Sequence, residues 1–385
     1  MTSRRSSFDL TTNSLSRAID AARAAKRPFL DLTVSNPTTA DFPYDQAAIL
    51  RALSDPRALT YDPLPFGLPS AREAVARELS EIHPIDPSRV VLTASSSEAY
   101  AFLFKLFCDP GDEFAICAPS YPLFEHLATL ESVSVATYAL RYDGAWHVDL
   151  DSLKRAIGQK TRAIVTVNPN NPTGSFLSLE ELSRLADFGL PILSDEVFAT
   201  YALTEDASRA TTARLAKDAL VFSLGGLSKL AALPQMKLGW IAASGPHALV
   251  DDALAKLEVI ADTFLSVGTP VQHALPTLLA SGKKTAAAIS ARTKKNLVAL
   301  DRLLGKNSTA TRLEVDGGWY ATLHLPSIQS EEEWALGFLN DDSVLVHPGA
   351  FFDFESEAFV VLSLLTRERD FEEGVTRIAR RLASS

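Results

Sequence analysis

The sequence has few cysteines, no long apolar run and no dense block of basic residues, and each absence removes a class of protein. Two cysteines, Cys108 and Cys117, are too few for a disulfide framework and lack the spacing of metal ligands. No apolar stretch reaches the roughly 18 residues that a membrane-spanning helix needs. The 37 basic residues are outnumbered by 47 acidic ones, and the net charge of -10 disfavours nucleic acids and anionic membranes as partners. We therefore expect a small-molecule enzyme without a metal site.

The length and composition are those of a globular protein with more than one core. The 385 residues exceed what a single hydrophobic core usually holds, so two domains are expected. Apolar residues make up 46% of the chain, enough to form sizeable cores. The first seven residues carry Arg4 and Arg5 among serines, but no apolar signal region follows. The expected location is the cytoplasm.

The order of apolar and amphipathic segments predicts an α/β fold. Between residues 45 and 260, short apolar runs alternate with longer amphipathic stretches, which is typical of parallel strands joined by crossover helices. We predict a large domain over residues 45–265 with a mostly parallel sheet, and a smaller α+β domain from residues 1–44 and 266–385. The expected strands are Val90–Thr93, Glu113–Ala118, Val133–Ala139, Ala163–Val167, Pro191–Ser194, Leu220–Ser223, Gly239–Ala243, Ala321–Leu325 and Phe359–Leu364, and the expected helices include Asn13–Lys26, Ala248–Phe264 and Ala286–Leu304.

Three successive strands end in residues of chemical interest. The segment Asn168–Gly174, which reads N-P-N-N-P-T-G, follows one strand, Asp195 follows the next, and Lys229 follows the third. Because α/β sheets bind ligands at the carboxyl ends of their strands, these residues should share one edge. Pyridoxal 5'-phosphate (PLP) needs such a set. An amine condenses with its aldehyde (Lys229), a carboxylate keeps its pyridine nitrogen protonated (Asp195), and an amide donates to its phenolate oxygen (Asn171).

Over nearly its full length, the chain resembles the class I/II aminotransferases, a family of fold type I PLP enzymes. The resemblance extends to D-G-G-W-Y at residues 316–320 and V-H-P-G at residues 346–349. It implies an aspartate aminotransferase-like fold, in which a mostly parallel sheet of the large domain is joined to the smaller domain. It also implies the movement of an amino group between an α-amino acid and a 2-oxo acid, with Lys229 as the catalytic residue.

The resemblance implies further residues that bind the cofactor. Ser95, Ser96 and Ser97 resemble the helix N-terminus that holds the phosphate, where free N–H groups and the helix dipole favour an anion. Tyr121 is expected to stack on the pyridine ring. Tyr61 resembles the tyrosine that one subunit lends to the phosphate of its neighbour, and a homodimer is therefore expected.

Three of the expected cofactor contacts differ from the common family pattern. Lys237 stands where most relatives have an arginine, so the phosphate would meet a point charge in place of a planar fork. Gly226 replaces a phosphate-binding serine, with Ser228 or Ser223 as candidate substitutes. Phe198 replaces a tyrosine, which leaves Asn171 as the main side-chain donor to the phenolate oxygen.

The largest difference concerns the arginine that binds the substrate carboxylate in most class I aminotransferases. Alignment of the last strand puts Val361 at that position. Arg367 and Arg369 lie nearby, but a solvated loop before the terminal helix is the favoured interpretation of both. The amides of Asn36 and Asn171 are the remaining candidates for contact with the substrate.

The sequence leaves alternatives open beside transamination. The same framework also supports other reactions, so a PLP-dependent carbon-sulfur β-lyase is the second interpretation, and a non-catalytic PLP-binding protein is the third. The identity of the amino acid is also open, although aromatic residues could form an apolar pocket for its side chain. These residues are Phe66, Trp319, Tyr320, Phe351 and Phe352.

Overall fold

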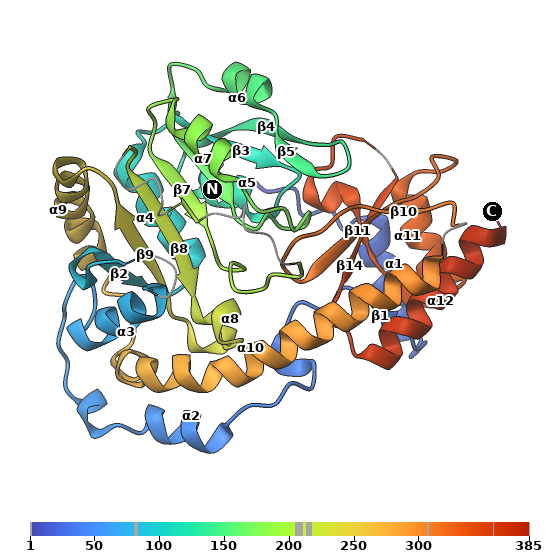
Figure 1. Cartoon of the computed structure of the whole chain (residues 1–385), viewed down its shortest axis with the longest axis horizontal. Coiled ribbons are helices and arrows are strands. Elements are labelled where there is room, and N and C mark those ends of the chain that lie inside the picture. Colours follow the sequence, from blue (N-terminus) through green and yellow to red (C-terminus); the bar gives the residue numbers. More distant parts are fainter. Residues whose placement is uncertain are drawn as a thin grey trace.

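A computed structural model describes residues 2–80, 84–204, 211–212, 218–305, 308–356 and 358–384. The largest element of the fold is an eight-stranded sheet in a chain of mixed helices and strands (Figure 1). Its strands are β2 (Val90–Thr93), β3 (Glu113–Ala118), β4 (Ser134–Tyr142), β5 (Trp146–Val148), β6 (Thr161–Val167), β7 (Ile192–Asp195), β8 (Val221–Gly226) and β9 (Gly239–Ser244). They are arranged in the order β2-β9-β8-β7-β6-β3-β4-β5.

The direction of the strands places their reactive ends together. Strands β8, β7, β6, β3 and β4 pair in parallel, whereas β9 is antiparallel to both of its neighbours and β5 is antiparallel to β4. The mostly parallel α/β sheet expected from the sequence is confirmed. All seven strands predicted for it are present within a few residues at their ends. The eighth, β5, has only three residues, which is too short to leave a periodic pattern.

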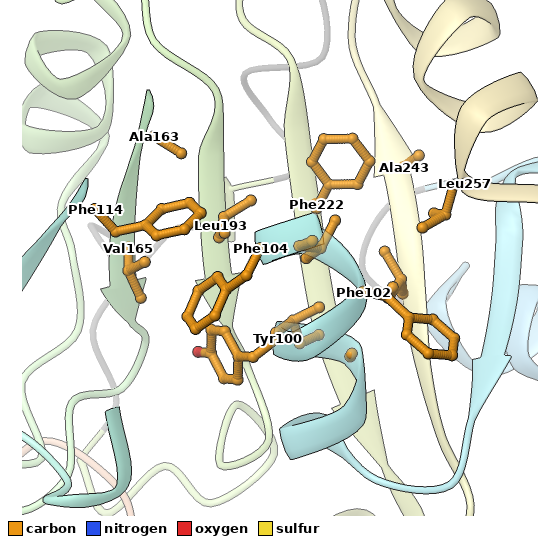
Figure 2. Packing of buried hydrophobic residues seen from close by; sticks show 14 of the residues in the cluster. Tyr100, Phe102, Phe104, Phe114, Ala163, Val165, Leu193, Phe222, Ala243 and Leu257 are labelled. Atoms are coloured by element: carbon orange, nitrogen blue, oxygen red, sulfur yellow. The ribbon is translucent and has the colours of Figure 1, made fainter. Parts of the chain in front are cut away.

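Helices cover both faces of the large sheet, because alternate residues of each strand are apolar on each side. One face packs against α4 (Ser96–Phe107), α5 (Leu123–Leu130) and α9 (His247–Phe264). Figure 2 shows Phe104 and Tyr100 of α4 on the same face of the sheet as Leu193 and Phe222, with which they share one apolar cluster. The other face packs against α6 (Leu150–Ala156) and α7 (Leu179–Ala186). This sandwich holds the strand ends in fixed positions.

A smaller, separate core lies at the other end of the molecule (Figure 1). Its four-stranded antiparallel sheet has the order β10-β11-β14-β13, and β1 pairs in parallel with β12 beside it. This arrangement confirms the α+β architecture that the sequence predicts for the smaller domain. The strands are β1 (Leu30–Asp31), β10 (Thr311–Arg312), β11 (Tyr320–His324), β12 (Val344–Leu345), β13 (His347–Pro348) and β14 (Phe359–Ser363), and the helices are α1 (Ser14–Ala24), α11 (Glu331–Asn340) and α12 (Glu368–Ser384).

One long helix connects the two cores. Helix α10 (Thr269–Leu304) begins 17 residues before the start expected from the sequence and contains Pro276. Its first half packs against α3 (Pro69–Leu79) and β2, and its last turns pack against the smaller core, as the long orange helix in Figure 1 shows. The division at residue 265 stays a prediction, because α10 belongs to both cores. The remaining helices are α2 (Gln46–Leu53), α8 (Leu227–Leu230) and the 3-10 turns η1 (Arg4–Ser6), η2 (Pro37–Thr39), η3 (Pro56–Leu59), η4 (Pro87–Arg89), η6 (Pro234–Met236) and η7 (Gly349–Phe352).

None of the helices in the described ranges has both the length and the apolar content that crossing a bilayer requires.

Candidate active site

A cavity of about 410 Å³ lies at the carboxyl ends of the parallel strands, where the large sheet meets the smaller one. One wall comes from β7, α8, α4 and α5, and the opposite wall comes from β11, β13 and η7. The structure brings together at this cavity most of the residues that the sequence singled out. They are Ser95, Ser96, Ser97, Tyr121, Asn171, Asp195, Lys229 and Lys237.

Lys229 enters the cavity from the short helix α8, which follows β8 directly. The hydroxyl of Tyr201 donates a 2.6 Å hydrogen bond to the main-chain carbonyl of Lys229 and so fixes this turn. The Nζ atom lies 4.9 Å from the ring centre of Trp319 and 5.5 Å from that of Phe198. Burial lowers the pKa of the Lys229 amine from 10.5 to about 8, and the charge of Asp195 opposes this shift. The amine is therefore easier to deprotonate than an ordinary lysine.

Asp195 ends β7 and is buried in the same cavity. The amide of Val197 donates to its Oδ1 at 3.1 Å, and the hydroxyl of Tyr100 donates to its Oδ2 at 3.3 Å. Burial raises the pKa of Asp195 to about 6, while these hydrogen bonds and Lys229 oppose the rise. The two donors thus fix the orientation of the carboxylate. Because the charged form is buried, a cationic partner would stabilise it.

The loop after β6 orients the amide of Asn171. Its neighbours carry the loop's own hydrogen bonds: Asn170 donates to the carbonyl of Pro119 at 3.0 Å, and Asn168 accepts from the amide of Leu177 at 3.0 Å. The Asn171 side chain is buried, and its Oδ1 atom receives no hydrogen bond from any residue that the structure describes. A buried amide in this state is available to a bound ligand.

Two glycines join this loop to the smaller sheet. A Cβ atom on Gly174, whose φ is +72°, would lie 2.4 Å from the carbonyl oxygen of Gly317. A Cβ atom on Gly317 would lie 2.5 Å from the ring of Phe176. Side chains at these two positions would force the loop away from Trp319 and from β11, which begins at Tyr320. The glycines of N-P-T-G and D-G-G-W-Y therefore allow the loop and the smaller sheet to pack closely together.

The N-terminus of α4 forms the anion-binding part of the cavity. The Ser95 hydroxyl caps the helix by accepting from the amide of Glu98 at 3.2 Å. The amides of Ser96 and Ser97 are in the first turn, where no helical carbonyl is available to them. Strand β9 approaches this turn closely, since a Cβ atom on Gly239 would lie 3.2 Å from the nitrogen of Ser96. This geometry can bind a phosphate at the helix N-terminus.

Lys237 supplies positive charge beside this helix end. It lines the cavity and has a left-handed backbone conformation, with φ 48° and ψ 55°. A non-glycine residue in this region costs about 1 kcal/mol or more and is typical of functional sites. A Cβ atom on Gly226 would lie 3.1 Å from the Cα atom of Gly239, so a serine here would require a small shift of β9. Of the two candidate substitutes, Ser228 lines the cavity, whereas Ser223 is buried beside Thr212.

Two predicted contact residues lie away from the cavity of this chain. Tyr61 is 74% exposed and borders a different, much smaller pocket. Asn36 caps the turn η2 by accepting from the amide of Thr38 at 3.0 Å and from its hydroxyl at 2.7 Å. The neighbouring Ser35 lines the cavity instead.

No arginine lines the cavity among the described residues. Val361 is fully buried on β14. Arg367 forms a 2.5 Å ion pair with Asp41 at the surface, as the solvated-loop interpretation expected. Arg369 is also exposed, but it lies in the first turn of α12 and not in a loop before it. Within the described parts of the chain, no three His, Cys, Asp or Glu side chains gather as a metal ion would need to bind the carboxylate instead.

The aromatic residues expected to form an apolar pocket divide into two groups. Tyr320, Phe351 and Phe352 line the cavity. Trp319 is fully buried beneath Lys229, and Phe66 packs against the core of the large sheet. The cavity is therefore mainly apolar on the side of the smaller sheet.

Sequence reasoning missed several residues of the site. Tyr100 lies one helical turn after Ser96, so its place on α4 could have been found from spacing alone. His347 belongs to the V-H-P-G segment but had no role assigned to it, because its neighbour across the sheet could not be known. The other missed lining residues are Ser35, Leu123, Phe124, Leu127, Val167, Val197 and Pro234.

Comparison with known proteins gives consistent matches. The family profile "Aminotransferase class I and II" matches residues 27–378. The glutamate-pyruvate aminotransferase of Haemophilus influenzae is 27% identical over 337 residues, which cover 82% of this chain and 81% of that protein. The alanine aminotransferase of Mycobacterium bovis is 28% identical over 83% of this chain and 77% of its own length. The structure of alanine aminotransferase from Pyrococcus furiosus superposes with a TM-score of 0.89 at 22% identity, with all of both chains covered.

Proposed function

Because this chain belongs to the class I and II aminotransferases, we propose that it uses PLP in this cavity to move an amino group between an α-amino acid and a 2-oxo acid. The observation that supports PLP most directly is the meeting of Lys229, Asp195 and Asn171 in one cavity. Each of the three side chains can still interact with a ligand. Lys229 presents a largely buried amine, Asp195 presents a carboxylate in a fixed orientation, and the buried amide oxygen of Asn171 has no hydrogen bond from the described residues.

The residues present fit each part of the cofactor. The α4 N-terminus with Ser96, Ser97 and the charge of Lys237 would hold the phosphate. Asp195 would hold the protonated pyridine nitrogen, and the Asn171 amide, oriented with its nitrogen towards the ring, would donate to the phenolate oxygen. When bound, PLP supplies an aldehyde for amine exchange and a conjugated ring that accepts the electron pair from the amino acid's Cα.

Lys229 has the properties of the residue that moves protons. Its amine has a pKa of about 8 because burial disfavours the charged form. An amine with a pKa near the working pH can both accept and donate a proton at the substrate's Cα. The Tyr201 hydroxyl holds the backbone of Lys229, so the amine keeps its position through both half-reactions.

Tyr100 and Val197 hold the carboxylate of Asp195 in one orientation. Their hydrogen bonds favour its charged form against the effect of burial. A charged Asp195 stabilises a positive pyridine nitrogen, and this charge is what makes the ring an acceptor of electrons. The hydroxyl of Tyr100 thus contributes to catalysis through Asp195.

We further propose a neutral, mainly apolar side chain for the preferred amino acid. The wall of the cavity formed by Tyr320, Phe351, Phe352, Leu123 and Phe124 is apolar or aromatic. This choice agrees with the names of the relatives for alanine and pyruvate, but not for glutamate.

A homodimer in the cytoplasm completes the proposal. Tyr61, beside the exposed Leu59 and Leu64, lies outside its own chain's cavity and is free to reach a second copy. Cys108 and Cys117 are both free thiols, in agreement with a reducing compartment.

An absorption experiment tests the proposed reaction. The PLP-loaded protein is mixed in turn with L-alanine, L-glutamate, L-leucine and L-phenylalanine, and pyruvate or 2-oxoglutarate is added afterwards. We expect the visible band of the lysine-bound cofactor to disappear with a donor and to return with the 2-oxo acid. Lys229→Ala should abolish the band and reduce turnover by about 10³-fold, whereas Lys256→Ala, at the surface, should change neither.

Two results would contradict the proposal. One is turnover in Lys229→Ala equal to that of the unmodified chain. The other is release of pyruvate and ammonia without transfer of the amino group, which would identify a β-lyase.

A further inference from the structure

The face of β14 that borders the active site has no cation for a substrate carboxylate. Val361 on this face is buried in an apolar cluster with Tyr320, Phe352 and Leu365. Among the residues that the structure describes, the lysines and arginines that line the cavity are Lys229 and Lys237, and the proposed function uses both for the cofactor. An amino acid and its 2-oxo acid both carry a carboxylate, so a different residue must meet it if the proposed function holds.

The adjacent strand supplies a residue at the corresponding place. Strands β13 and β14 are antiparallel, and His347 is the direct register partner of Val361. Directly opposite residues of an antiparallel pair point to the same face of a sheet. His347 therefore shares the site-facing side with Val361, and it lines the cavity.

The ring of His347 is held in place by its neighbours. It stacks on Phe351 with a centroid distance of 5.0 Å and an angle of 9° between planes, and it meets Phe352 edge to face at 5.7 Å. The main chain of Thr33 lies near enough to the ring to favour its charged form, which assigns one ring nitrogen to Thr33. The second nitrogen of an imidazole remains for a ligand. A ring fixed on three sides loses little freedom when it binds one.

We propose that His347 binds the carboxylate of the amino acid and of the 2-oxo acid, in the place of the arginine that Val361 replaces. This inference rests on the proposed function. It identifies His347 as a residue that determines affinity for the carboxylate, while Lys229 and Asp195 carry out the chemistry. An imidazole donates one hydrogen bond to a carboxylate, whereas an arginine donates two in one plane. Selection of the substrate therefore depends more on the side chain of the amino acid than it would with an arginine.

The charges around His347 bear on its protonation. Burial lowers its pKa, and Asp31 on β1 and the main chain of Thr33 oppose this shift. Glu331 lies on α11, which packs against β13, and Tyr320 lies on β11, while Lys229 and Lys237 line the cavity. A carboxylate at the ring would favour the charged imidazolium. Apparent affinity for the amino acid should therefore weaken as pH rises, with kcat less affected.

Two ligands that differ only at the carboxylate can separate its contribution to affinity from that of the rest of the substrate. The wild-type holoenzyme is titrated with L-alanine, L-glutamate, L-leucine and L-phenylalanine, and the donor with the lowest half-saturating concentration is then compared with its own carboxamide. In His347→Leu we expect the half-saturating concentration to rise about tenfold or more for the amino acid and less than about twofold for the amide. His347→Gln, which keeps an N–H donor, should fall between wild type and His347→Leu.

Control measurements distinguish binding from folding. His324→Leu removes an exposed histidine of β11 that is not part of the cavity and should leave both ligands unaffected. The cofactor band of His347→Leu should match that of the wild type. An equal loss of affinity for the amino acid and its amide, or no loss for either, would overturn the role of His347. A wild-type enzyme that converts none of the four donors would overturn the proposed function itself, and this inference with it.

Discussion

At the scale of single residues, the site places an acid and an amine where burial disfavours the charge of each. Burial shifts the pKa of Asp195 up to about 6 and that of Lys229 down to about 8, so each group is pushed towards its neutral form. Strongly shifted pKa values cluster at functional sites, because catalysis needs ionisable groups in buried positions where they lower the stability of the fold. The stability of the cofactor-free protein should therefore improve when one of them is removed.

Asp195→Asn should stabilise the cofactor-free protein in a pH-dependent way. The folded pKa of about 6 lies above the ordinary value of 3.8, so the folded state binds more protons between these pH values and its stability falls as pH rises through them. Above pH 6 the charged carboxylate costs about 3 kcal/mol of unfolding free energy, and the asparagine avoids this cost. Urea unfolding at a series of pH values should show the advantage of the variant growing from pH 4 to pH 7, while its turnover is lost.

The exposed Asp187→Asn serves as the control, since its carboxylate is 67% exposed. It should show no such growth with pH. An Asp195→Asn protein that is less stable than wild type at pH 7 would mean that Tyr100 and Val197 stabilise the charged carboxylate more than burial penalises it.

The place of a residue at the cavity can be predicted from sequence where the residue follows a strand directly. Asp195 and Lys229 line the cavity because strand ends collect at one edge of a parallel sheet, and their roles towards PLP stay predictions. Tyr100, Ser35 and His347 were missed because their positions depend on which helix and which neighbouring strand pack there. Asn36 was chosen for its amide, but that amide caps η2, and such local hydrogen bonding is common for asparagine.

At the scale of elements, the contact between α10 and α8 positions Lys229, the proposed catalytic residue. Gly282 of α10 faces Ala231, the residue after α8, and an added Cβ atom would lie 2.4 Å from the Ala231 Cβ. Replacing glycine with alanine inside a helix normally stabilises it by up to about 1 kcal/mol. Here the clash should outweigh that gain.

Gly282→Ala should destabilise the protein by about 1–3 kcal/mol, the usual range for overpacking. It should also weaken PLP binding, because α8 carries Lys229. Denaturant unfolding and a PLP titration measure the two effects. Gly337→Ala in α11 is the matched control, since its Cβ would meet only the flexible end of Arg381 at 3.3 Å. Equal stability changes for the two variants would refute the close contact at α8.

Element-level prediction succeeded for strands with a clear apolar run and covered only the second half of α10. Pro276 interrupts the helical pattern and normally costs about 3 kcal/mol within a helix. The buried Leu275, Leu278 and Leu279 pack against α3 and β2 and keep the helix intact around it. Tertiary packing of this kind leaves no local signal. The two-residue strands β12 and β13 were missed for the same reason.

At the scale of the whole molecule, the cavity lies between two cores that share a junction. Trp319, Tyr201, Phe198 and Ile289 belong to the apolar cluster between the two sheets, below Lys229. The site therefore depends on the relative position of both cores. The proposed dimer would add a third contribution, from Tyr61 of a second copy.

Mixing two inactive variants tests the shared site. Tyr61→Phe removes the hydroxyl that would reach the neighbour's phosphate, and Lys229→Ala removes the catalytic amine. If each site takes Lys229 from one chain and Tyr61 from the other, a mixed dimer has one intact site. Refolding the two variants together should give more activity per chain than either alone, measured at saturating donor and limiting PLP. A chain that runs as a monomer in sedimentation experiments, or a mixture without any gain, would contradict the shared site.

The proposed reaction passes nitrogen from an amino acid to a 2-oxo acid. Mass spectrometry can follow this transfer directly when the PLP-loaded protein receives a donor amino acid with isotopically labelled nitrogen and an unlabelled 2-oxo acid. We expect labelled amino acid formed from the 2-oxo acid, in an amount equal to the donor consumed. Label recovered as free ammonia, or label that stays in the donor, would contradict transamination.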